Sequence, residues 1–163
     1  MKPNDTLSEK HSYRLSYRHA ETSDLPDLIA MLADDKLGQL REDTSSPVNP
    51  RYQAVLKAIL EDPNNELMVV EYNQRIAGML QLTFIPYLSH TGSWRCLIES
   101  VRVHSDFRGR GLGTEFVQWS IERARERQCN LVQLTSDKQR PEALKFYRNL
   151  GFVDSHEGFK LKL

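Results

Sequence analysis

Residues 101–114 read Val-Arg-Val-His-Ser-Asp-Phe-Arg-Gly-Arg-Gly-Leu-Gly-Thr, and this segment decides the fold. The β-branched residues at its start predict a strand that ends near His104, because such side chains favour extended backbone. Three glycines then alternate with Arg110 and Leu112, which predicts a turn. Behind the turn, apolar residues recur at helical spacing: Leu112, Phe116, Val117, Ile121 and Ala124. The segment therefore predicts a strand, a glycine-rich turn and an amphipathic helix.

This arrangement is typical of a site that binds an anion. Glycine allows positive φ and carries no Cβ that would hold a ligand away from the backbone amides. The first N–H groups of a helix have no intrahelical partner and form the positive end of the helix dipole. A phosphate is the most natural ligand for such a helix start. The alternative is a glycine-rich turn that merely joins the strand to the helix.

Two common phosphate-binding motifs do not match this turn. The P-loop requires a lysine after its last glycine, and none follows Gly113. The dinucleotide fingerprint G-x-G-x-x-G fails because Thr114 stands where its third glycine belongs. The acidic residue expected about 20 positions later is also missing, since residues 128–134 are neutral.

Two segments resemble the GNAT superfamily of acetyl-CoA-dependent N-acetyltransferases, in its bacterial single-domain form. Arg108-x-x-Gly111-x-Gly113 corresponds to the family's Q/R-x-x-G-x-G/A segment. Residues 143–152, Ala-Leu-Lys-Phe-Tyr-Arg-Asn-Leu-Gly-Phe, correspond to its A-x-x-F-Y-x-x-x-G-F segment. The resemblance implies acetyl transfer from acetyl-CoA to an amine, with no metal.

The order of the predicted elements indicates an α+β fold in α/β/α layers. Early strands joined by short turns pair antiparallel, whereas the strand–helix–strand unit at the glycine turn needs a right-handed parallel crossover. We therefore expect a mixed, mostly antiparallel central sheet with helices on both faces. The GNAT resemblance implies the same fold and adds that the two parallel strands splay apart around the pantetheine arm of the cofactor.

Periodicity and turn residues give the expected elements. Residues 1–12 are expected to form a flexible tail, and residues 13–163 a single domain. Tyr13, Leu15 and Tyr17 alternate as in a strand, and Thr22 or Ser23 is expected to cap a helix. The further expected elements are a helix after Pro50 with Tyr52, Val55, Leu56 and Ile59 inward, strands at Leu67–Tyr72, Ile76–Ile85, Trp94–His104 and Leu131–Thr135, a helix from Pro141 to just before Gly151, and two paired strands at Phe152–Ser155 and Phe159–Leu163.

The resemblance assigns cofactor contacts to the strand and the turn. The strand offers backbone groups to the pantetheine amides, and the turn offers amides to the pyrophosphate, with Arg108 and Arg110 as counter-charges. Arg140 stands where many members have an asparagine, so the usual side-chain amide contact is not expected. Arg140 is still expected to contact the cofactor, for example at a phosphate. The expected cofactor-binding residues are Val101, Arg102, Val103, Arg108, Gly109, Arg110, Gly111, Leu112, Gly113, Thr114 and Arg140.

Tyr147 is the first candidate catalytic residue. In the GNAT family the tyrosine of this motif protonates or steadies the departing CoA thiolate. A phenol with a pKa of about 10 suits that donation. Helical spacing alone would also explain Tyr147 as a core aromatic beside Ala143 and Leu150.

Glu99 is the second candidate catalytic residue. An alkyl ammonium has a pKa of about 10.4, and its deprotonation at pH 7 costs roughly 4–5 kcal/mol, so a base or a water chain should face the amine. Strand alternation places Glu99 with Leu97, Val101 and Val103, an apolar setting that would raise its pKa. Many GNAT members carry a glutamate here. A β-bulge would reverse this alternation, and a purely structural carboxylate is the alternative.

Composition limits the other function classes. Lys plus Arg and Asp plus Glu both total 22, so the net charge of zero argues against nucleic-acid binding through bulk charge. Two cysteines are too few for a disulfide framework or a zinc cage, and the histidines lack metal-ligand spacing. No apolar run reaches membrane-span length and no signal peptide is evident, so the cytoplasm is expected.

The acceptor amine is not specified by the sequence. Asp34, Asp35, Glu42 and Asp43 either attract a cationic amine or are solvated surface charge. A second set of residues, Tyr87, His90 and Trp94, either lines the acceptor pocket or lies in a contact between subunits. The leading hypothesis is direct acetyl transfer to a small-molecule or peptide amine, and the resemblance also suggests a homodimer. The alternative is an acyl-CoA-binding sensor without turnover.

Overall fold

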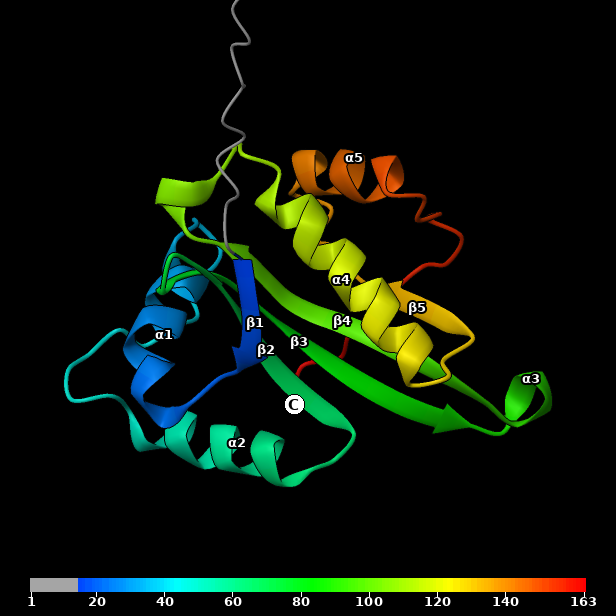
Figure 1. The fold of residues 1–163 in the computed structure, drawn as a ribbon, viewed down its shortest axis with the longest axis horizontal. Helices are drawn as coiled ribbons and strands as arrows, with labels where there is room; N and C mark the ends of the chain where they lie inside the picture. The colour runs from blue at the N-terminus through cyan, green and yellow to red at the C-terminus, as the bar shows by residue number, and fades with distance from the viewer. Residues whose placement is uncertain (1–14) are drawn as a thin grey trace, which may run out of the picture.

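A five-stranded sheet organises the computed structural model, which describes residues 15–163. The strands run in the order β1 to β5, and only β4 and β5 pair parallel (Figure 1). Their bounds are β1 Leu15–His19, β2 Asn65–Tyr72, β3 Arg75–Tyr87, β4 Ser93–Val103 and β5 Leu131–Leu134. This mixed sheet confirms the expected fold class. The predicted tail and Tyr13 lie outside the described residues.

Residues 15–163 form seven helical segments besides the strands. The α-helices are α1 Leu25–Ala33, α2 Pro50–Glu61, α3 Ser89–Gly92, α4 Leu112–Glu126 and α5 Pro141–Asn149, and the 3₁₀ turns are η1 Thr22–Asp24 and η2 Ser105–Phe107. Prolines lie in the first turns of α1, α2 and α5, where no hydrogen bond is lost. The expected cap at Thr22 or Ser23 is wrong: both lie inside η1, which Glu21 and Asp24 cap reciprocally.

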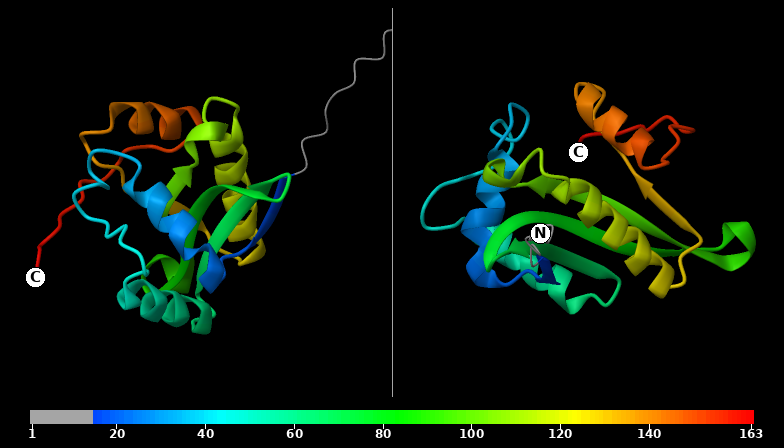
Figure 2. Two further views of the ribbon diagram at one scale, coloured as in Figure 1. Left: turned by 90° about the vertical axis from the view of Figure 1, so that its left-hand side faces the viewer. Right: turned by 45° about the horizontal axis from the view of Figure 1, so that its top comes forward.

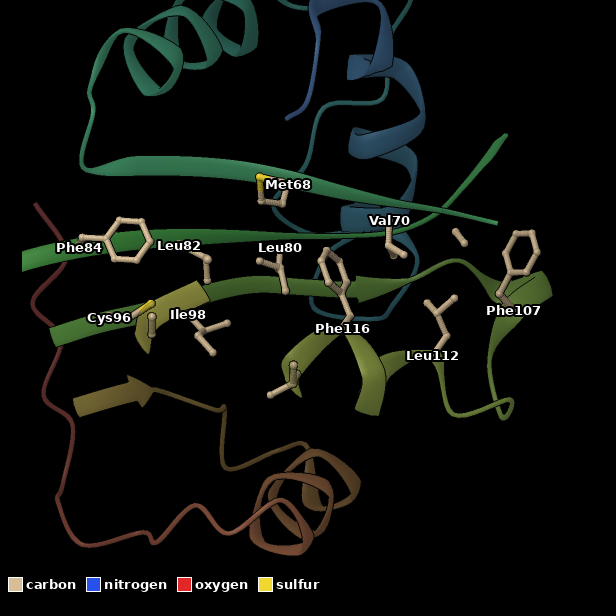
Figure 3. Packing of buried hydrophobic residues seen from close by; sticks show 13 residues of the cluster. Met68, Val70, Leu80, Leu82, Phe84, Cys96, Ile98, Phe107, Leu112 and Phe116 are labelled. Atoms are coloured by element: carbon tan, nitrogen blue, oxygen red, sulfur yellow. The ribbon is translucent and has the colours of Figure 1, made fainter. Parts of the chain in front are cut away.

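The sheet separates two hydrophobic layers. One layer packs under α4 and α5, and the other packs under α1 and α2 (Figures 1 and 2). Leu80, Leu82 and Phe116 point into the α4 layer (Figure 3), whereas Met79 belongs to the opposite layer. In α2 only Leu56 is buried, and Val55 is exposed, contrary to expectation.

A β-bulge in β4 changes which face its residues occupy. Met79 pairs with Arg102 and Gln81 pairs with Glu99, so two β4 residues lie opposite one β3 residue. Ser100, in the bulge, has a positive φ of 54°. Because directly paired residues share a face, the Glu99 and Arg102 side chains lie on the α1/α2 face of the sheet.

The parallel pair separates part-way along β4. Pairing runs from Arg95 with Leu131 to Ile98 with Leu134 and then stops, while β4 continues to Val103. The edge of β4 from Glu99 to Val103 therefore has no β5 partner. This divergence agrees with the splay that the resemblance implied.

The two strands predicted at the C-terminal end are wrong. Residues 152–155 and 159–163 follow α5 without forming a strand. Phe159, Leu161 and Leu163 alternate as a strand would, but all three are exposed. Alternation alone does not make a strand when no neighbouring strand supplies hydrogen bonds. Within residues 15–163, no helix has the length and apolar character needed to cross a membrane.

Candidate functional site

The glycine-rich turn leads into α4 with the backbone that the sequence predicted. Gly109 has φ 73° and Gly111 has φ 81°, values in the left-handed region that favours glycine. Gly111 is the N-cap of α4, and a Cβ added at Gly109 or Gly111 would meet no atom within 4 Å. The two glycines therefore keep the space in front of the helix open.

The backbone amides of this turn are free to bind an anion. Among residues 15–163, no acceptor takes a hydrogen bond from the N–H groups of residues 109–114. Six consecutive donors at a helix start match the oxygens of a diphosphate. The residues present thus fit the pyrophosphate of a CoA cofactor.

Packing and hydrogen bonds hold the turn in place. Phe107 is buried beneath the turn, and the guanidinium of Arg110 lies 6.0 Å from the centre of its ring. His104 Nδ1 accepts a hydrogen bond from the Asp106 N–H at 3.2 Å. Arg108 is not a free counter-charge, since it donates to the Val103 carbonyl at 3.0 Å and pairs with Asp34 at 2.7 Å.

The carbonyls of the unpaired β4 edge are already in use. The Val101 carbonyl accepts a hydrogen bond from Nη1 of Arg102 at 2.8 Å, and the Val103 carbonyl accepts one from Arg108. The Val101 and Val103 side chains pack into the α4 layer. The expected backbone contacts to pantetheine stay a prediction, and they would require these two arginines to shift or the cofactor to use other groups of the edge.

Tyr147 packs among aromatic rings on α5 beside the diverging strands. The centre of its ring lies 5.0 Å from that of Phe146 and 5.8 Å from that of Phe152, and both contacts are edge-on. Burial raises the pKa of Tyr147, while the nearby charges of Arg102 and Arg140 act in the opposite direction. No residue in the range 15–163 forms a hydrogen bond with its hydroxyl. The ring is thus a packing residue, and its hydroxyl stays available to a ligand.

Glu99 does not lie where alternation placed it. The bulge at Ser100 puts Val101 and Val103 in the α4 layer and leaves Glu99 on the α1/α2 face, paired with Gln81. Glu99 is exposed, so the apolar surroundings expected for it are absent. Its role as a base stays a prediction, now on a face open to solvent.

A charged cluster that the sequence did not predict joins three distant segments on that face. Arg140, the N-cap of α5, pairs with Asp35 at 2.6 Å, and Arg102 Nη2 lies 3.9 Å from the same oxygen. Asp35 also accepts the Gly38 N–H at 2.6 Å. Although burial alone would raise the pKa of Asp35, its backbone hydrogen bonds and the two guanidiniums lower it.

The other acidic residues between α1 and α2 are also engaged. Asp34 pairs with Arg108, and Glu42 accepts the Tyr52 hydroxyl at 2.9 Å. Asp43 accepts hydrogen bonds from Ser45 and Asn49. Asp34 and Asp35 are thus paired with arginines, whereas Glu42 and Asp43 accept hydrogen bonds from neutral groups. Attraction of a cationic amine by these carboxylates stays a prediction.

The remaining candidates lie away from the turn. Tyr87, His90 and Trp94 surround the β3–β4 connection at α3, at the opposite end of β4 (Figure 1). Cys96 is buried in the α4 layer, and burial raises the pKa of its thiol to about 12. Cys129 is half-buried. No group of three or more metal-ligating side chains occurs within residues 15–163.

Comparison with known proteins identifies relatives of this arrangement. The profile of the acetyltransferase (GNAT) family matches residues 30–152. Aminoalkylphosphonate N-acetyltransferase of Salmonella typhimurium is 28% identical over 145 residues, which cover 87% of each chain. A crystal structure described as a transcriptional regulator from Bacillus halodurans C-125 is 51% identical, with a TM-score of 0.88 over 92% of this chain and 100% of that one. A Trypanosoma brucei acetyltransferase is 26% identical, with a TM-score of 0.72 over 92% and 100%.

Proposed function

Because the chain belongs to the GNAT family of acetyltransferases, we propose that it transfers the acetyl group of acetyl-CoA directly to a primary amine within a ternary complex. The single observation that carries the proposal is the row of free amides at residues 109–114, near the end of the β4 edge that has no β5 partner. That arrangement supports a diphosphate at the helix start and a thioester beside the β4 edge.

The proposed cofactor contacts are mostly backbone contacts. The amides of residues 109–114 would bind the pyrophosphate, with the Arg110 side chain as a counter-charge, since it forms no ion pair within residues 15–163. The β4 edge at Val101–Val103 would bind the pantetheine arm. Acetyl-CoA supplies the activated acetyl group, and the protein supplies position and charge.

The amine must lose a proton before it attacks the thioester carbon. Glu99 lies on the α1/α2 face, exposed, and is proposed to accept that proton directly or through water. The N–C bond then forms while the C–S bond breaks. A backbone N–H of the β4 edge would stabilise the carbonyl oxygen, a contribution of about 2–4 kcal/mol.

The leaving thiolate needs a proton in its turn. Tyr147 is proposed to donate it from a hydroxyl that has no protein partner in residues 15–163. The charges of Arg102 and Arg140 lower the pKa of this phenol against the larger effect of burial. They therefore favour proton donation to sulfur.

A second candidate function is acyl-CoA sensing without turnover. The Bacillus halodurans structure, at 51% identity, is described as a transcriptional regulator. A sensor needs the free amides but has no use for Glu99 or for the Tyr147 hydroxyl. The two functions therefore differ in turnover and in their response to changes at those two residues.

The localisation and the oligomer are further proposals. The homodimer is supported by the family resemblance alone, and the cytoplasmic location stays a prediction. Sedimentation equilibrium of the purified chain would test the dimer.

The proposed activity is tested by release of free thiol from acetyl-CoA with a panel of amines. Intersecting double-reciprocal lines are expected for a ternary complex, and parallel lines would indicate an acetyl-enzyme instead. Acetyl-CoA binding without turnover on any amine would favour the sensor. Failure to bind acetyl-CoA at all would contradict both functions.

A further inference from the structure

The geometry points to an acceptor amine that also carries an oxyanion group, a phosphonate, phosphate or carboxylate, bound by Arg102 and Arg140. This inference rests on the proposed acetyl transfer and specifies the substrate class of the same site. Its basis is an excess of half-buried positive charge beside Tyr147.

Arg102 lacks the partners that a buried guanidinium requires. Its side chain is 14% exposed, and its Nε is buried without a hydrogen-bond acceptor in residues 15–163. Nη1 donates to the neighbouring Val101 carbonyl, and Nη2 lies 3.9 Å from Asp35, beyond hydrogen-bond distance. Burial and then the charge of Arg140 lower the pKa of Arg102. A buried cation with open donor sites is costly unless a ligand completes it.

One carboxylate serves two arginines in this cluster. Oδ2 of Asp35 is shared between Arg140 at 2.6 Å and Arg102 at 3.9 Å, so the three groups carry a net charge of one positive unit. Arg41 and Glu42 act on Arg102 with opposite signs and add no net charge. An oxyanion bound here would neutralise this net positive charge. Its oxygens would accept paired hydrogen bonds from the free N–H groups of the guanidiniums.

The Arg102 side chain and the glycine turn lie on opposite faces of the sheet. Arg102 pairs with Met79, which belongs to the α1/α2 layer. The glycine turn begins α4 on the other face, where Gly113 adjoins the Val103 and Phe146 side chains. The Arg102 and Arg140 guanidiniums therefore meet beside Asp35 in the α1–α2 connection, where Glu99 shares the face with Arg102.

The same charges disfavour a purely cationic acceptor. Both guanidiniums act electrostatically on Tyr147, so an amine at that point experiences the net positive charge of the cluster. In the α1–α2 connection, the carboxylates of Asp34 and Asp35 are both paired with arginines. A molecule with an anionic end offsets the repulsion and places its amine toward Glu99 and Tyr147.

The experiment compares four small amines of similar length with saturating acetyl-CoA: 2-aminoethylphosphonate, β-alanine, n-propylamine and ethylenediamine. We expect kcat/KM for at least one of the two oxyanion amines to exceed that for n-propylamine by about tenfold or more, and ethylenediamine to be the poorest substrate. Ethylphosphonate, which lacks the amine, should inhibit competitively against the acceptor and not against acetyl-CoA.

Two variants separate recognition from structure. Arg140→Gln should raise KM for the oxyanion acceptor about tenfold or more and should reduce the preference for that acceptor over n-propylamine. Asp35→Asn should lower that KM, because it removes the carboxylate that competes with the acceptor for the arginines. If the cluster were purely structural, KM would not rise in one variant and fall in the other. Arg148→Gln is the matched control, since Arg148 lies on the same helix and pairs with Asp154 away from the cluster. Arg102→Gln is the secondary variant, as it alters a buried position.

The outcomes separate this inference from the proposed function. Turnover of n-propylamine or ethylenediamine as fast as the oxyanion amines, with no effect of Arg140→Gln, would overturn the inference and leave acetyl transfer intact. An Arg140→Gln effect confined to KM for acetyl-CoA would assign Arg140 to the cofactor, also against the inference. No turnover and no acetyl-CoA binding would contradict the proposed function itself.

Discussion

Replacing Gly111 by alanine tests the glycine turn at its centre. Gly111 is the N-cap of α4 at φ 81°, and its N–H is one of the six free amides proposed to bind the diphosphate. A Cβ there would meet no protein atom within 4 Å. The substitution therefore adds a methyl group to the space reserved for a ligand and creates no clash in the free protein.

The expected cost to stability is small and comes from the backbone. Alanine in the left-handed region is less stable than glycine by about 1 kcal/mol. For a chain of this size that corresponds to a fall in Tm of about 2–4 °C. The expected cost to binding is larger, because a methyl group in front of the amides removes charge-assisted hydrogen bonds worth about 1.5–3 kcal/mol each. The Kd for CoA should rise at least tenfold.

Gly151→Ala is the matched control. Gly151 has φ 90° and also faces open space, but it follows α5 rather than beginning a helix. Thermal unfolding should show similar losses of Tm for the two variants, while isothermal titration with CoA should show weaker binding for Gly111→Ala alone. Equal CoA affinity in both variants would refute the assignment of the diphosphate to this turn.

Further predictions concern catalysis, acid stability and the cysteines. Tyr147→Phe should keep the ring packing and CoA affinity but lower kcat about 10–100-fold; unchanged kcat would remove the hydroxyl from the reaction. Glu99→Gln should lower kcat/KM at neutral pH, and its kcat/KM should approach that of wild type as the pH rises and the amine deprotonates. A variant-to-wild-type ratio of kcat/KM that does not change with pH would exclude the base role. Burial would raise the pKa of Asp24, but hydrogen bonds from Arg18 and the Glu21 N–H lower it overall. The ionised Asp24 therefore stabilises the fold above about pH 4, and this stabilisation is lost as the pH falls through the pKa of Asp24 in the folded protein. Asp24→Asn should accordingly cost about 1.5–3 kcal/mol in urea unfolding at pH 7 and flatten the acid dependence, since Arg18 binds this carboxylate at 2.7 and 3.0 Å; no loss at pH 7 would show that the pair is not stabilising. Cys96→Ala should retain turnover. Loss of turnover in a variant that still folds would indicate an acetyl-enzyme.

Much of the frame was predictable from local signals. The positions of Gly111, Pro141 and Gly151 each require a particular backbone, and all three occupy the helix ends expected of them. The turn at Asn73 and Gln74, both at positive φ, lies between the two segments that the sequence predicts as strands at Leu67–Tyr72 and Ile76–Ile85. Such signals depend on a few neighbouring residues and survive tertiary packing.

The orientation of the site residues was not predictable in the same way. The bulge rests on a positive φ at Ser100, a residue type with no strong preference for that backbone, and it moves Glu99 to the opposite face from Val101. Without the bulge, alternation would have been a sound guide. A single extra residue in β4 thus decides which side chains face the acceptor.

Long-range charge pairing was also hidden in the sequence. Asp35 and Arg140 meet only because the α1–α2 connection reaches the start of α5. Nothing in their local sequence distinguishes them from Asp34 or Arg148, which pair elsewhere. The C-terminal alternation at Phe159 and Leu161 failed for the converse reason, since a correct local pattern found no neighbouring strand.

Backbone NMR during a titration with CoA tests the central claim most directly. The account predicts the largest amide shifts at residues 109–114, since these N–H groups have no acceptor among residues 15–163 in the unliganded protein. Smaller shifts are expected along the β4 edge at Val101–Val103. Saturable binding that leaves the amides of residues 109–114 unshifted would contradict it.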